Sequence, residues 1–358
     1  MTITQETAAA AATTIDADEL AEFVAVAREY GERAVGRLAL ELDVGSPEAI
    51  DRCWRGLGEI GLDRCLLDQP AGGAGLPDGA MAPLTEAVAG GDGGVALLML
   101  SSNIALAVLP QELTAKLVDN ARWAYVPTSG VRAAGDSLPA LIDGRLTGTA
   151  RFALGTFGAD GYVFECRDGE ELALAAVVAG ADGLIENQVD DQLALGAAAA
   201  SELVMLDTPA TRIGGAAEAA RADALVNAGT AAIARGTAHR AGMLALEYAE
   251  NRYQGGGRII IHGAVRDMLG RMSEREIGMA PPVDLSGPVD PATALAQKIA
   301  ATDAAVETTM DAVQVFGGMG YMHETGVEKL MRDAKYCQLW PVPNWVGRDA
   351  LLELRRGR

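Results

Sequence analysis

The first third of the chain has its apolar residues at the spacing of amphipathic helices. The clearest example steps by three and four positions along one helix face: Leu20, Phe23, Val24 and Ala27. Clusters of turn-forming residues interrupt this region at Gly45–Pro47 and Pro70–Gly75. The pattern predicts an N-terminal helical domain over residues 15–120.

The longest apolar run lies near the end of this region, at Gly93–Pro110. It is bounded by glycine and proline and contains the polar triplet Ser101-Ser-Asn103, so it predicts a buried helix and no membrane span. Residues 1–14 have no basic segment before their alanine run, which does not resemble a signal peptide. We therefore expect a disordered tail on a cytoplasmic protein.

The pattern of apolar and polar residues changes between residues 121 and 212, where short apolar runs are bounded by glycine and aspartate. Four runs have the length of strands: Ala140–Gly144, Tyr162–Cys166, Leu172–Val178 and Glu202–Leu206. Short strands joined by tight turns predict a small central β domain. The alanine-rich runs do not alternate cleanly, so buried helices remain an alternative for some of them.

Long helical patterns return from residue 213 to the end of the chain. The first, Ala217–Asn251, stops at the glycines Gly255–Gly257, and a second is expected over His262–Ile277. After a proline-rich linker, a third runs from Pro291 to Phe316. Successive long helices predict a C-terminal bundle of the four-helix type over residues 213–358.

Composition and charge narrow the functional classes. The 358 residues include 29 Lys and Arg against 49 Asp and Glu, and the net charge of -20 disfavours binding to nucleic acid or to anionic membranes. The four cysteines and three histidines are dispersed, so no disulfide framework and no metal site is expected. A nucleotide cofactor would need local arginine or backbone N–H groups, which draws attention to Arg252.

Three segments combine unusual residue types in a fixed order: Tyr248–Gly256, Gln314–Gly318 and Val327–Lys335. With weaker similarities in both earlier domains, the chain resembles the acyl-CoA dehydrogenase family over most of its length. The resemblance implies an α+β fold with an N-terminal helical domain, a central β domain and a C-terminal bundle. It also implies an oxidoreductase that transfers hydride from an acyl thioester to FAD.

The resemblance also implies cofactor contacts. Arg252 matches an arginine that binds the pyrophosphate of an FAD held mainly by a neighbouring subunit, and guanidinium suits such a group. Gln314, Gly317 and Gly318 match the segment at the adenosine end of FAD. On the residues alone, the glycines could instead cap a helix and Arg252 could be a solvated charge.

Two further cofactor contacts are implied nearer the flavin ring. Phe152 stands at the tryptophan of the family's flavin-facing Trp-x-Thr segment, with Leu154 in place of the threonine. Trp340 stands at a tyrosine beside the flavin. In Val327–Lys335, the i,i+4 spacing predicts the salt bridges Glu328–Arg332 and Lys329–Asp333 and a structural role.

The resemblance fails at the catalytic base. Family members abstract the α-proton with a glutamate, and an ungapped match puts Pro341 at that position. Proline accepts no proton and has no N–H to donate, and Pro343 removes a second N–H. The alternative position early in the long helix is Val226, so the catalytic residue is unknown.

Carboxylates near these positions in the sequence are Asp223, Glu247 and Asp349. Three functions remain open: a dehydrogenase with a displaced base, a non-catalytic or half-site subunit of a heteromeric acyl-CoA dehydrogenase, and flavin-dependent oxygenation on the same fold. The resemblance implies an acyl-CoA or acyl-carrier-protein thioester as substrate, a homo- or hetero-oligomer, and an electron-transferring flavoprotein as a further partner.

Overall fold

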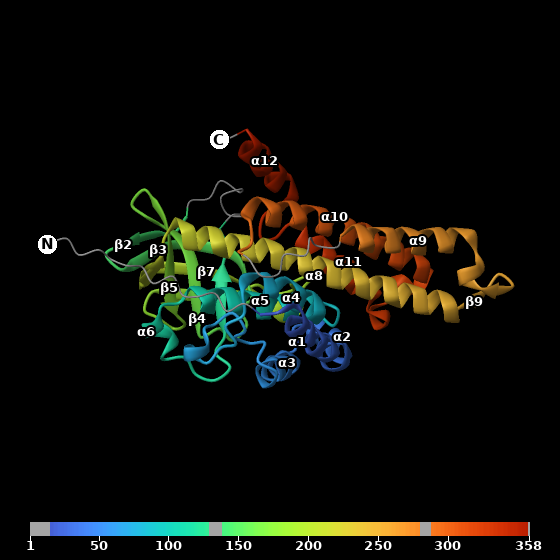
Figure 1. Ribbon diagram of the computed structural model, residues 1–358, viewed down its shortest axis with the longest axis horizontal. Helices are drawn as coiled ribbons and strands as arrows, with labels where there is room; N and C mark the ends of the chain where they lie inside the picture. The colour runs from blue at the N-terminus through green and yellow to red at the C-terminus, as the bar shows by residue number, and fades with distance from the viewer. Residues whose placement is uncertain (1–14, 129–137, 280–287, 357–358) are drawn as a thin grey trace.

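The protein is described here by a computed structural model, which describes residues 15–128, 138–279 and 288–356. The tail predicted at residues 1–14, and most of the proline-rich linker, lie outside these ranges. The N-terminal part is helical, as expected (Figure 1). Its helices are α1 (Ala17–Tyr30), α2 (Ala39–Asp43), α3 (Pro47–Glu59), α4 (Met81–Ala89), α5 (Gly93–Val108) and α6 (Gln111–Thr114).

The start of each long helix in this part follows from the local sequence. Ser46 caps α3 by accepting the N–H of Ala49, with Pro47 in the first turn. Asp92 caps α5 in the same way, 2.9 Å from the Val95 nitrogen. Every residue of α5 except Ala107 is buried, so the apolar run predicted as a buried helix is one.

The central part forms an eight-stranded mixed sheet with the order β6-β7-β3-β2-β4-β5-β8, in which β1 pairs in parallel with β4. All four predicted runs are strands within it. The strands are β1 (Trp123–Val126), β2 (Ala140–Ile142), β3 (Arg145–Leu154), β4 (Gly161–Asp168), β5 (Glu171–Val178), β6 (Leu184–Gln188), β7 (Ala200–Pro209) and β8 (Thr211–Gly214).

A β-bulge near the end of β3 determines which side of the sheet its last side chains face. The pairing of β3 with β7 shifts register between Ala150 and Ala153, and Phe152 has a φ of 55°. As in other β-bulges, the extra residue re-aims the side chains that follow it. Phe152 is 61% exposed, whereas Leu154 is fully buried.

The C-terminal part is a bundle built on one very long helix. The helices are α8 (Ala216–Asn251), α9 (Gly263–Gly278), α10 (Pro291–Phe316), α11 (Val327–Cys337) and α12 (Asn344–Arg355). The 36 residues of α8 correspond to about 54 Å at the α-helical rise. α8 packs against α4 and α5 near the body of the molecule and against α9, α10 and α11 along the bundle.

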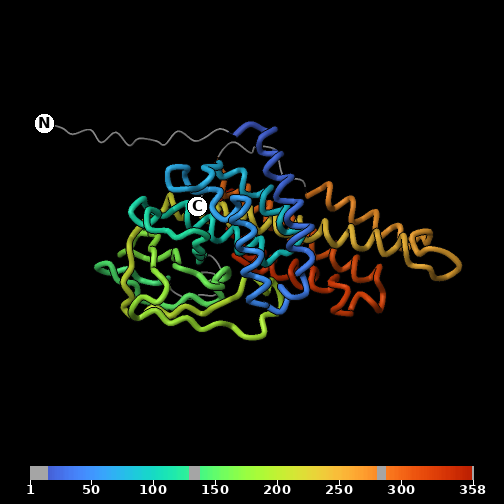
Figure 2. Tube along the Cα trace, turned by 90° about the horizontal axis from the view of Figure 1, so that it is seen from below, coloured from blue at the N-terminus to red at the C-terminus, as the bar shows by residue number. Residues whose placement is uncertain are grey.

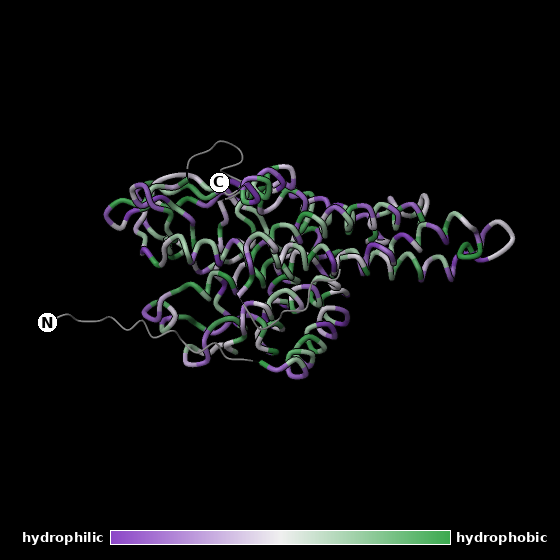
Figure 3. Tube along the Cα trace, turned by 45° about the horizontal axis from the view of Figure 1, so that its top comes forward, coloured by the Kyte–Doolittle hydropathy of each residue, from purple (hydrophilic) through white to green (hydrophobic). Residues whose placement is uncertain are grey.

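The bundle projects away from the sheet (Figures 1 and 2). At its far end, α8 leads into a hairpin of β9 (Tyr253–Gln254) and β10 (Gly257–Arg258). Figure 3 shows hydrophilic and hydrophobic stretches alternating along these projecting helices, as expected of amphipathic packing. Within the described ranges, none of the helices combines the length and the apolar character needed to cross a membrane.

Candidate functional site

Two of the three sequence motifs, Tyr248–Gly256 and Gln314–Gly318, meet at the far end of the bundle. The rings of Tyr248 on α8 and Phe316 on α10 stack with centroids 4.2 Å apart and an angle of 15° between their planes. Arg252 follows Tyr248 by one helical turn, and Gln314 and Gly317 flank Phe316. The stack therefore brings together residues that lie more than sixty positions apart in the sequence. We refer to Arg252, Gln314, Gly317 and Gly318 as the distal site.

All four residues of the distal site are exposed. Arg252 ends α8, and its carbonyl accepts the N–H of Ile259 at 2.9 Å. The turn of the hairpin requires glycine, because Gly255 and Gly256 have φ values of 66° and 90°. In the described part of the chain, no carboxylate pairs with Arg252. The guanidinium is thus free to bind an anion from outside the chain.

The donors of the distal site suit the pyrophosphate and adenosine end of FAD. A guanidinium binds phosphate oxygens through two N–H groups, and the amide of Gln314 both donates and accepts. A Cβ added to Gly317 or Gly318 would meet no atom within 4 Å, so the backbone there is open to a ligand or a second chain. These residues fit the group.

Phe152 on β3 and Trp340 after α11 lie apart from the distal site, so the predicted cofactor residues fall into two groups. Trp340 follows α11 and is only 8% exposed. It belongs to the large hydrophobic core that also contains Leu154 and Tyr125. Phe152 is exposed on β3 and is not part of this core. The structure therefore does not gather the six residues into one site.

The loop that replaces the family's catalytic segment, residues 338–344, is held by a buried lysine. Lys298 on α10 donates from Nζ to the carbonyl oxygen of Val342 at 2.7 Å, to Oδ1 of Asn344 at 2.8 Å and to the carbonyl oxygen of Gln338 at 3.3 Å. Burial lowers the pKa of Lys298 to about 7. Asp303, one turn further along α10, accepts from the amides of Gln338 and Asn344, each at 2.8 Å.

Few backbone donors of this loop remain for a flavin ring. The N–H groups of Leu339 and Trp340 bond to the Tyr336 carbonyl, and that of Asn344 bonds to the Gln338 carbonyl. Pro341 and Pro343 have no N–H. Leu154, where the family has a flavin-bonding threonine, is apolar and fully buried. The residues at this end do not fit the ring of a flavin held in the family's manner.

The three candidate carboxylates differ in their surroundings. Glu247 and Asp349 are exposed on helix surfaces. Asp223 is partly buried, and the Tyr125 hydroxyl lies 3.4 Å from its Oδ1. Burial and nearby carboxylates raise the pKa of Tyr125 well above its usual value. Asp223 is thus the only one of the three in a partly sheltered polar setting.

Tyr125 also donates to Glu165 at 2.9 Å, and Glu165 accepts the N–H of Thr128 at 3.1 Å and its hydroxyl. Pro127 cannot continue the strand pairing of β1, so the Glu165 carboxylate binds the next available N–H instead. This arrangement explains a fully buried glutamate as a support for the end of β1.

The salt bridges predicted in the Val327–Lys335 segment are present on α11, where they anchor the helix. Lys329 lies 2.5 Å from Asp333 and 2.8 Å from Asp92, and all three side chains are buried. Although burial alone would lower it, the two carboxylates raise the pKa of Lys329, which therefore remains charged. Asp333 also accepts the N–H of Leu195 at 2.7 Å. The motif has the structural role that its pattern predicts.

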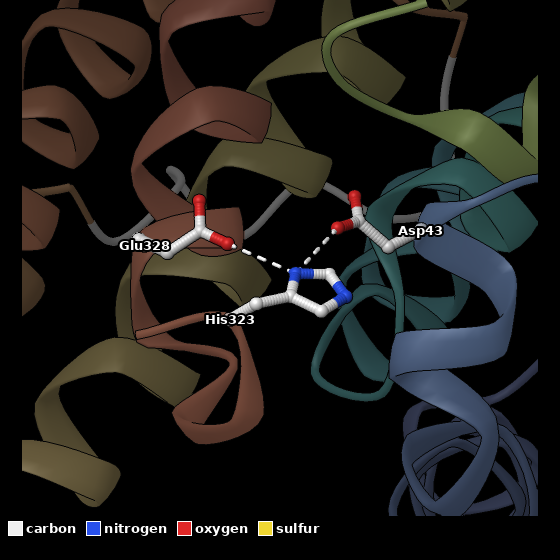
Figure 4. Close-up of side chains that lie close together, drawn as sticks. All are labelled: Asp43, His323 and Glu328. Carbon is white, nitrogen blue, oxygen red and sulfur yellow. Dashed lines mark hydrogen bonds and ion pairs between the residues drawn. The ribbon is translucent and has the colours of Figure 1, made fainter. Parts of the chain in front are cut away.

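The second predicted pair, Glu328–Arg332 on α11, also contacts Asp43 at the end of α2. Arg332 bonds to both carboxylate oxygens of Asp43, at 3.0 and 2.7 Å, and to both of Glu328, at 3.0 and 2.6 Å. The exposed ring of His323 points at the same carboxylates, 3.3 Å from Glu328 and 3.6 Å from Asp43 (Figure 4). These three residues could hold a metal by distance alone. Arg332 already pairs with both carboxylates, so we assign a structural salt-bridge cluster.

Two cavities lie away from all of these residues except Asp43 and Arg332. One of about 660 Å³ lies between α5, α6 and the start of α8 and is lined by leucines with Asp68 and Arg221. One of about 500 Å³ lies beside Arg332 and the segment between β6 and β7. None of the predicted cofactor residues lines either cavity.

Sequence reasoning missed Lys298, Glu165 and Tyr248. Tyr248 and Phe316 both stand in recognised motifs, and their aromatic character was the available signal for a stack. Lys298 lies among alanines on α10, one helical turn before Thr302, and its position alone indicates neither burial nor partners. His262 is found at the start of α9, as predicted, with Nε2 3.0 Å from the Gln254 carbonyl oxygen.

Comparison with known proteins agrees with this architecture. A family model described as "Acyl-CoA dehydrogenase, C-terminal domain" matches residues 226–341. Cyclohex-1-ene-1-carbonyl-CoA dehydrogenase of Geobacter metallireducens is 32% identical over 184 residues, which are 47% of this chain and 48% of that protein. The match thus spans about half the length of that relative.

Two solved structures share the fold over nearly the whole chain. Butyryl-CoA dehydrogenase from Megasphaera elsdenii superposes with a TM-score of 0.80 at 22% identity, covering 96% of this chain and 99% of that one. PigA with FAD and proline gives a TM-score of 0.82 at 19% identity, covering 96% and 99%. Residues 226–341 thus match the C-terminal domain of acyl-CoA dehydrogenases, and the chain as a whole shares the fold of a solved acyl-CoA dehydrogenase structure.

Proposed function

We propose that this chain is a half-site subunit of an acyl-CoA dehydrogenase-type flavoprotein. In this role its distal site completes the FAD site of a neighbouring homologous chain, and its own 338–344 loop supplies no base. The neighbouring chain would provide the glutamate and the surroundings of the flavin ring. FAD, when bound there, supplies the hydride acceptor for α,β-dehydrogenation of an acyl thioester.

The observation that carries the proposal is the contrast between the distal site and the 338–344 loop. Arg252 and Gln314 keep exposed donors for an anionic cofactor, but the loop that contains Trp340 is held at Lys298, 16 residues or about 24 Å of helix from Gln314 on α10. At that region the donors are lost and Pro341 stands in place of the base. A chain that keeps only the contacts useful to a neighbour is best explained as a partner subunit.

Within this role the residues of the chain have distinct tasks. Arg252 would bind the pyrophosphate, and Gln314 would orient the adenosine end beside the open backbone of Gly317 and Gly318. The Tyr248–Phe316 stack would keep these groups in one place. None of these tasks needs a proton transfer by this chain.

The second candidate function is a dehydrogenase whose catalytic base is Asp223. It draws support from the partly buried position of Asp223 beside Tyr125, and a sheltered carboxylate suits a general base. Two observations argue against this function: the 338–344 loop leaves few N–H groups for a flavin ring, and Leu154 is apolar and buried where the family has a threonine. Among the residues that the structure describes, none specifically favours flavin-dependent oxygenation.

The visible spectrum of the purified chain tests the proposal. Expressed alone, the chain should be colourless, and co-expression with a base-carrying homologue should give a yellow complex that acyl-CoA bleaches. Yellow protein from the chain alone that acyl-CoA bleaches would support the displaced base and contradict the half-site role. The acyl carrier, CoA or acyl-carrier protein, and transfer of electrons to an electron-transferring flavoprotein can be tested on the same complex.

A further inference from the structure

The larger of the two cavities, about 660 Å³, has an apolar inner wall. Four leucines line it, and all of them are buried parts of the large hydrophobic core: Leu66, Leu67, Leu106 and Leu109. The volume lies in the range of sites that enclose a small organic molecule, and such sites combine an apolar lining with a few polar groups. The cavity therefore has the size and the lining of a small-molecule site.

Hydrogen bonds hold the loop that forms one side of this cavity. The fully buried Asn103 on α5 accepts the N–H of Leu66 at 3.1 Å and donates to the carbonyl oxygen of Leu62 at 2.9 Å. Further along the loop, the N–H of Gly75 bonds back to the Leu67 carbonyl at 2.9 Å. The leucine wall is thus preformed, and a ligand does not have to order it on binding.

The polar rim of the cavity carries more negative than positive charge. Arg221 on α8 makes a bidentate contact with Asp78, at 2.8 and 2.7 Å, and also interacts electrostatically with Asp68 and Glu218. One guanidinium against three carboxylates leaves two negative charges in excess. Asp68 lines the cavity and is exposed, and within the described ranges its carboxylate has neither a hydrogen bond nor an ion pair.

This charge distribution favours one class of amphipathic molecule. A carboxylate or a phosphate at the rim would meet the excess of negative charge, and the net charge of -20 repels anions from the whole chain. An ammonium group beside Asp68 is attracted by both. The apolar part of the same molecule gains free energy with each methylene that it buries against the leucines.

We propose that this cavity binds a small amphipathic amine, with its apolar part against the leucine wall and its ammonium group beside Asp68. The inference goes beyond the half-site function and does not depend on it. The residues that line the cavity include none of the distal site and none of the 338–344 loop. The amine site is therefore present in the chain alone as well as in an assembled flavoprotein.

Calorimetric titration of the full chain at pH 7 with octylamine, 1-octanol and octanoate tests the class of ligand. Octylamine should bind at one site per chain, 1-octanol more weakly and octanoate most weakly. Hexylamine, which is shorter by two methylenes, should bind about 10–15-fold more weakly than octylamine. Octanoate that binds as tightly as octylamine, or an absence of saturable octylamine binding, would overturn the proposal.

Two charge variants with opposite expected effects test the rim. Asp68→Asn should weaken octylamine binding about two- to fivefold, as expected for a partly exposed ion pair, and leave 1-octanol unchanged. Arg221→Met should strengthen octylamine binding, because it removes a like charge and frees the Asp78 carboxylate. Asp182→Asn, at an exposed aspartate before β6, is the matched control. Unchanged affinity in Asp68→Asn, or a loss of affinity in a folded Arg221→Met chain, would contradict the position of the ammonium group.

A variant that fills the cavity tests the location. Ala107 on α5 lines the cavity, so Ala107→Phe should weaken the binding of octylamine and of 1-octanol at least about tenfold. Ala25→Phe, at an exposed position of α1, is the control and should leave both affinities unchanged. Circular dichroism and thermal unfolding establish that each variant is folded. Octylamine that binds a folded Ala107→Phe chain as tightly as the wild type would show that its site lies elsewhere and would overturn the proposal.

Discussion

Lys298 Nζ lies 2.7 Å from the carbonyl oxygen of Val342, in the loop where relatives carry their base. With the bonds to Asn344 and Gln338, all three donors of the ammonium group have acceptors. A fully buried lysine with three loop acceptors fixes the loop to α10. The segment that stands in place of the catalytic one, residues 338–344, is therefore held in a defined conformation by hydrogen bonds to α10.

Replacing Lys298 by methionine should destabilise the protein because it leaves two buried acceptors, the Val342 carbonyl and Oδ1 of Asn344, without their donor. We expect a loss of about 2–4 kcal/mol in the free energy of unfolding, measured by urea denaturation at pH 7. Lys335→Met, on the exposed end of α11, is the control and should change stability by less than about 0.5 kcal/mol.

The same variant tests the pKa of Lys298, which burial lowers from 10.5 to about 7. Between these two values the unfolded chain binds more protons than the folded chain, so this lysine makes stability rise with pH. Below pH 7 the amine is charged in both states and contributes no slope. The difference in unfolding free energy between the wild type and Lys298→Met should therefore grow from pH 7 to pH 10, and a constant difference would contradict the lowered pKa.

The stack of Tyr248 on Phe316 should govern the geometry of the distal site. Tyr248→Ala removes the stack and part of the surrounding packing, at a cost of about 1–3 kcal/mol. In the assembled complex, FAD should also dissociate faster, which flavin fluorescence would report. Tyr248→Phe keeps the ring, and since the Tyr248 hydroxyl has no partner in the described residues, both properties should be unchanged.

Arg252 should matter for FAD only when chains are assembled. Arg252→Gln removes charged hydrogen bonds to the pyrophosphate, and FAD affinity of the complex should fall about 10–100-fold, measured by flavin fluorescence on dilution. Arg258→Gln, in the same hairpin and paired across it with Tyr253, is the control. Equal losses in both variants would indicate a general effect of charge and no specific contact.

Much of the fold could be predicted because long helices and short strands carry local signals. The third bundle helix was expected over Pro291–Phe316, and α10 has these bounds. Proline in its first turn and glycine after its end are local features that tertiary contacts did not override. The salt bridges of α11 were predicted for the same reason, since i,i+4 spacing lies within one helix.

The site could be predicted only in part. The motifs identified Arg252 and Gln314, but the division of the cofactor residues between two ends depends on the length and direction of α8. Leu154 and Phe152 are two positions apart, which in a regular strand would place them on one face. The bulge in β3 separates them, and a register shift of this kind depends on the partner strand β7.

Restoring a carboxylate at position 341 should not restore catalysis by this chain. Pro341 is buried in a loop held by Lys298, so the charge introduced by Pro341→Glu would have to be buried, at a cost of about 3 kcal/mol. Because Leu154 and Trp340 still fill the core beside the loop, the purified variant should remain colourless and inactive toward acyl-CoA. Pro341→Gln has nearly the same shape without the charge, and its smaller loss of stability would isolate the cost of the carboxylate. A stable Pro341→Glu chain that binds flavin alone and is bleached by acyl-CoA would show that only the base was missing, which would contradict the half-site function.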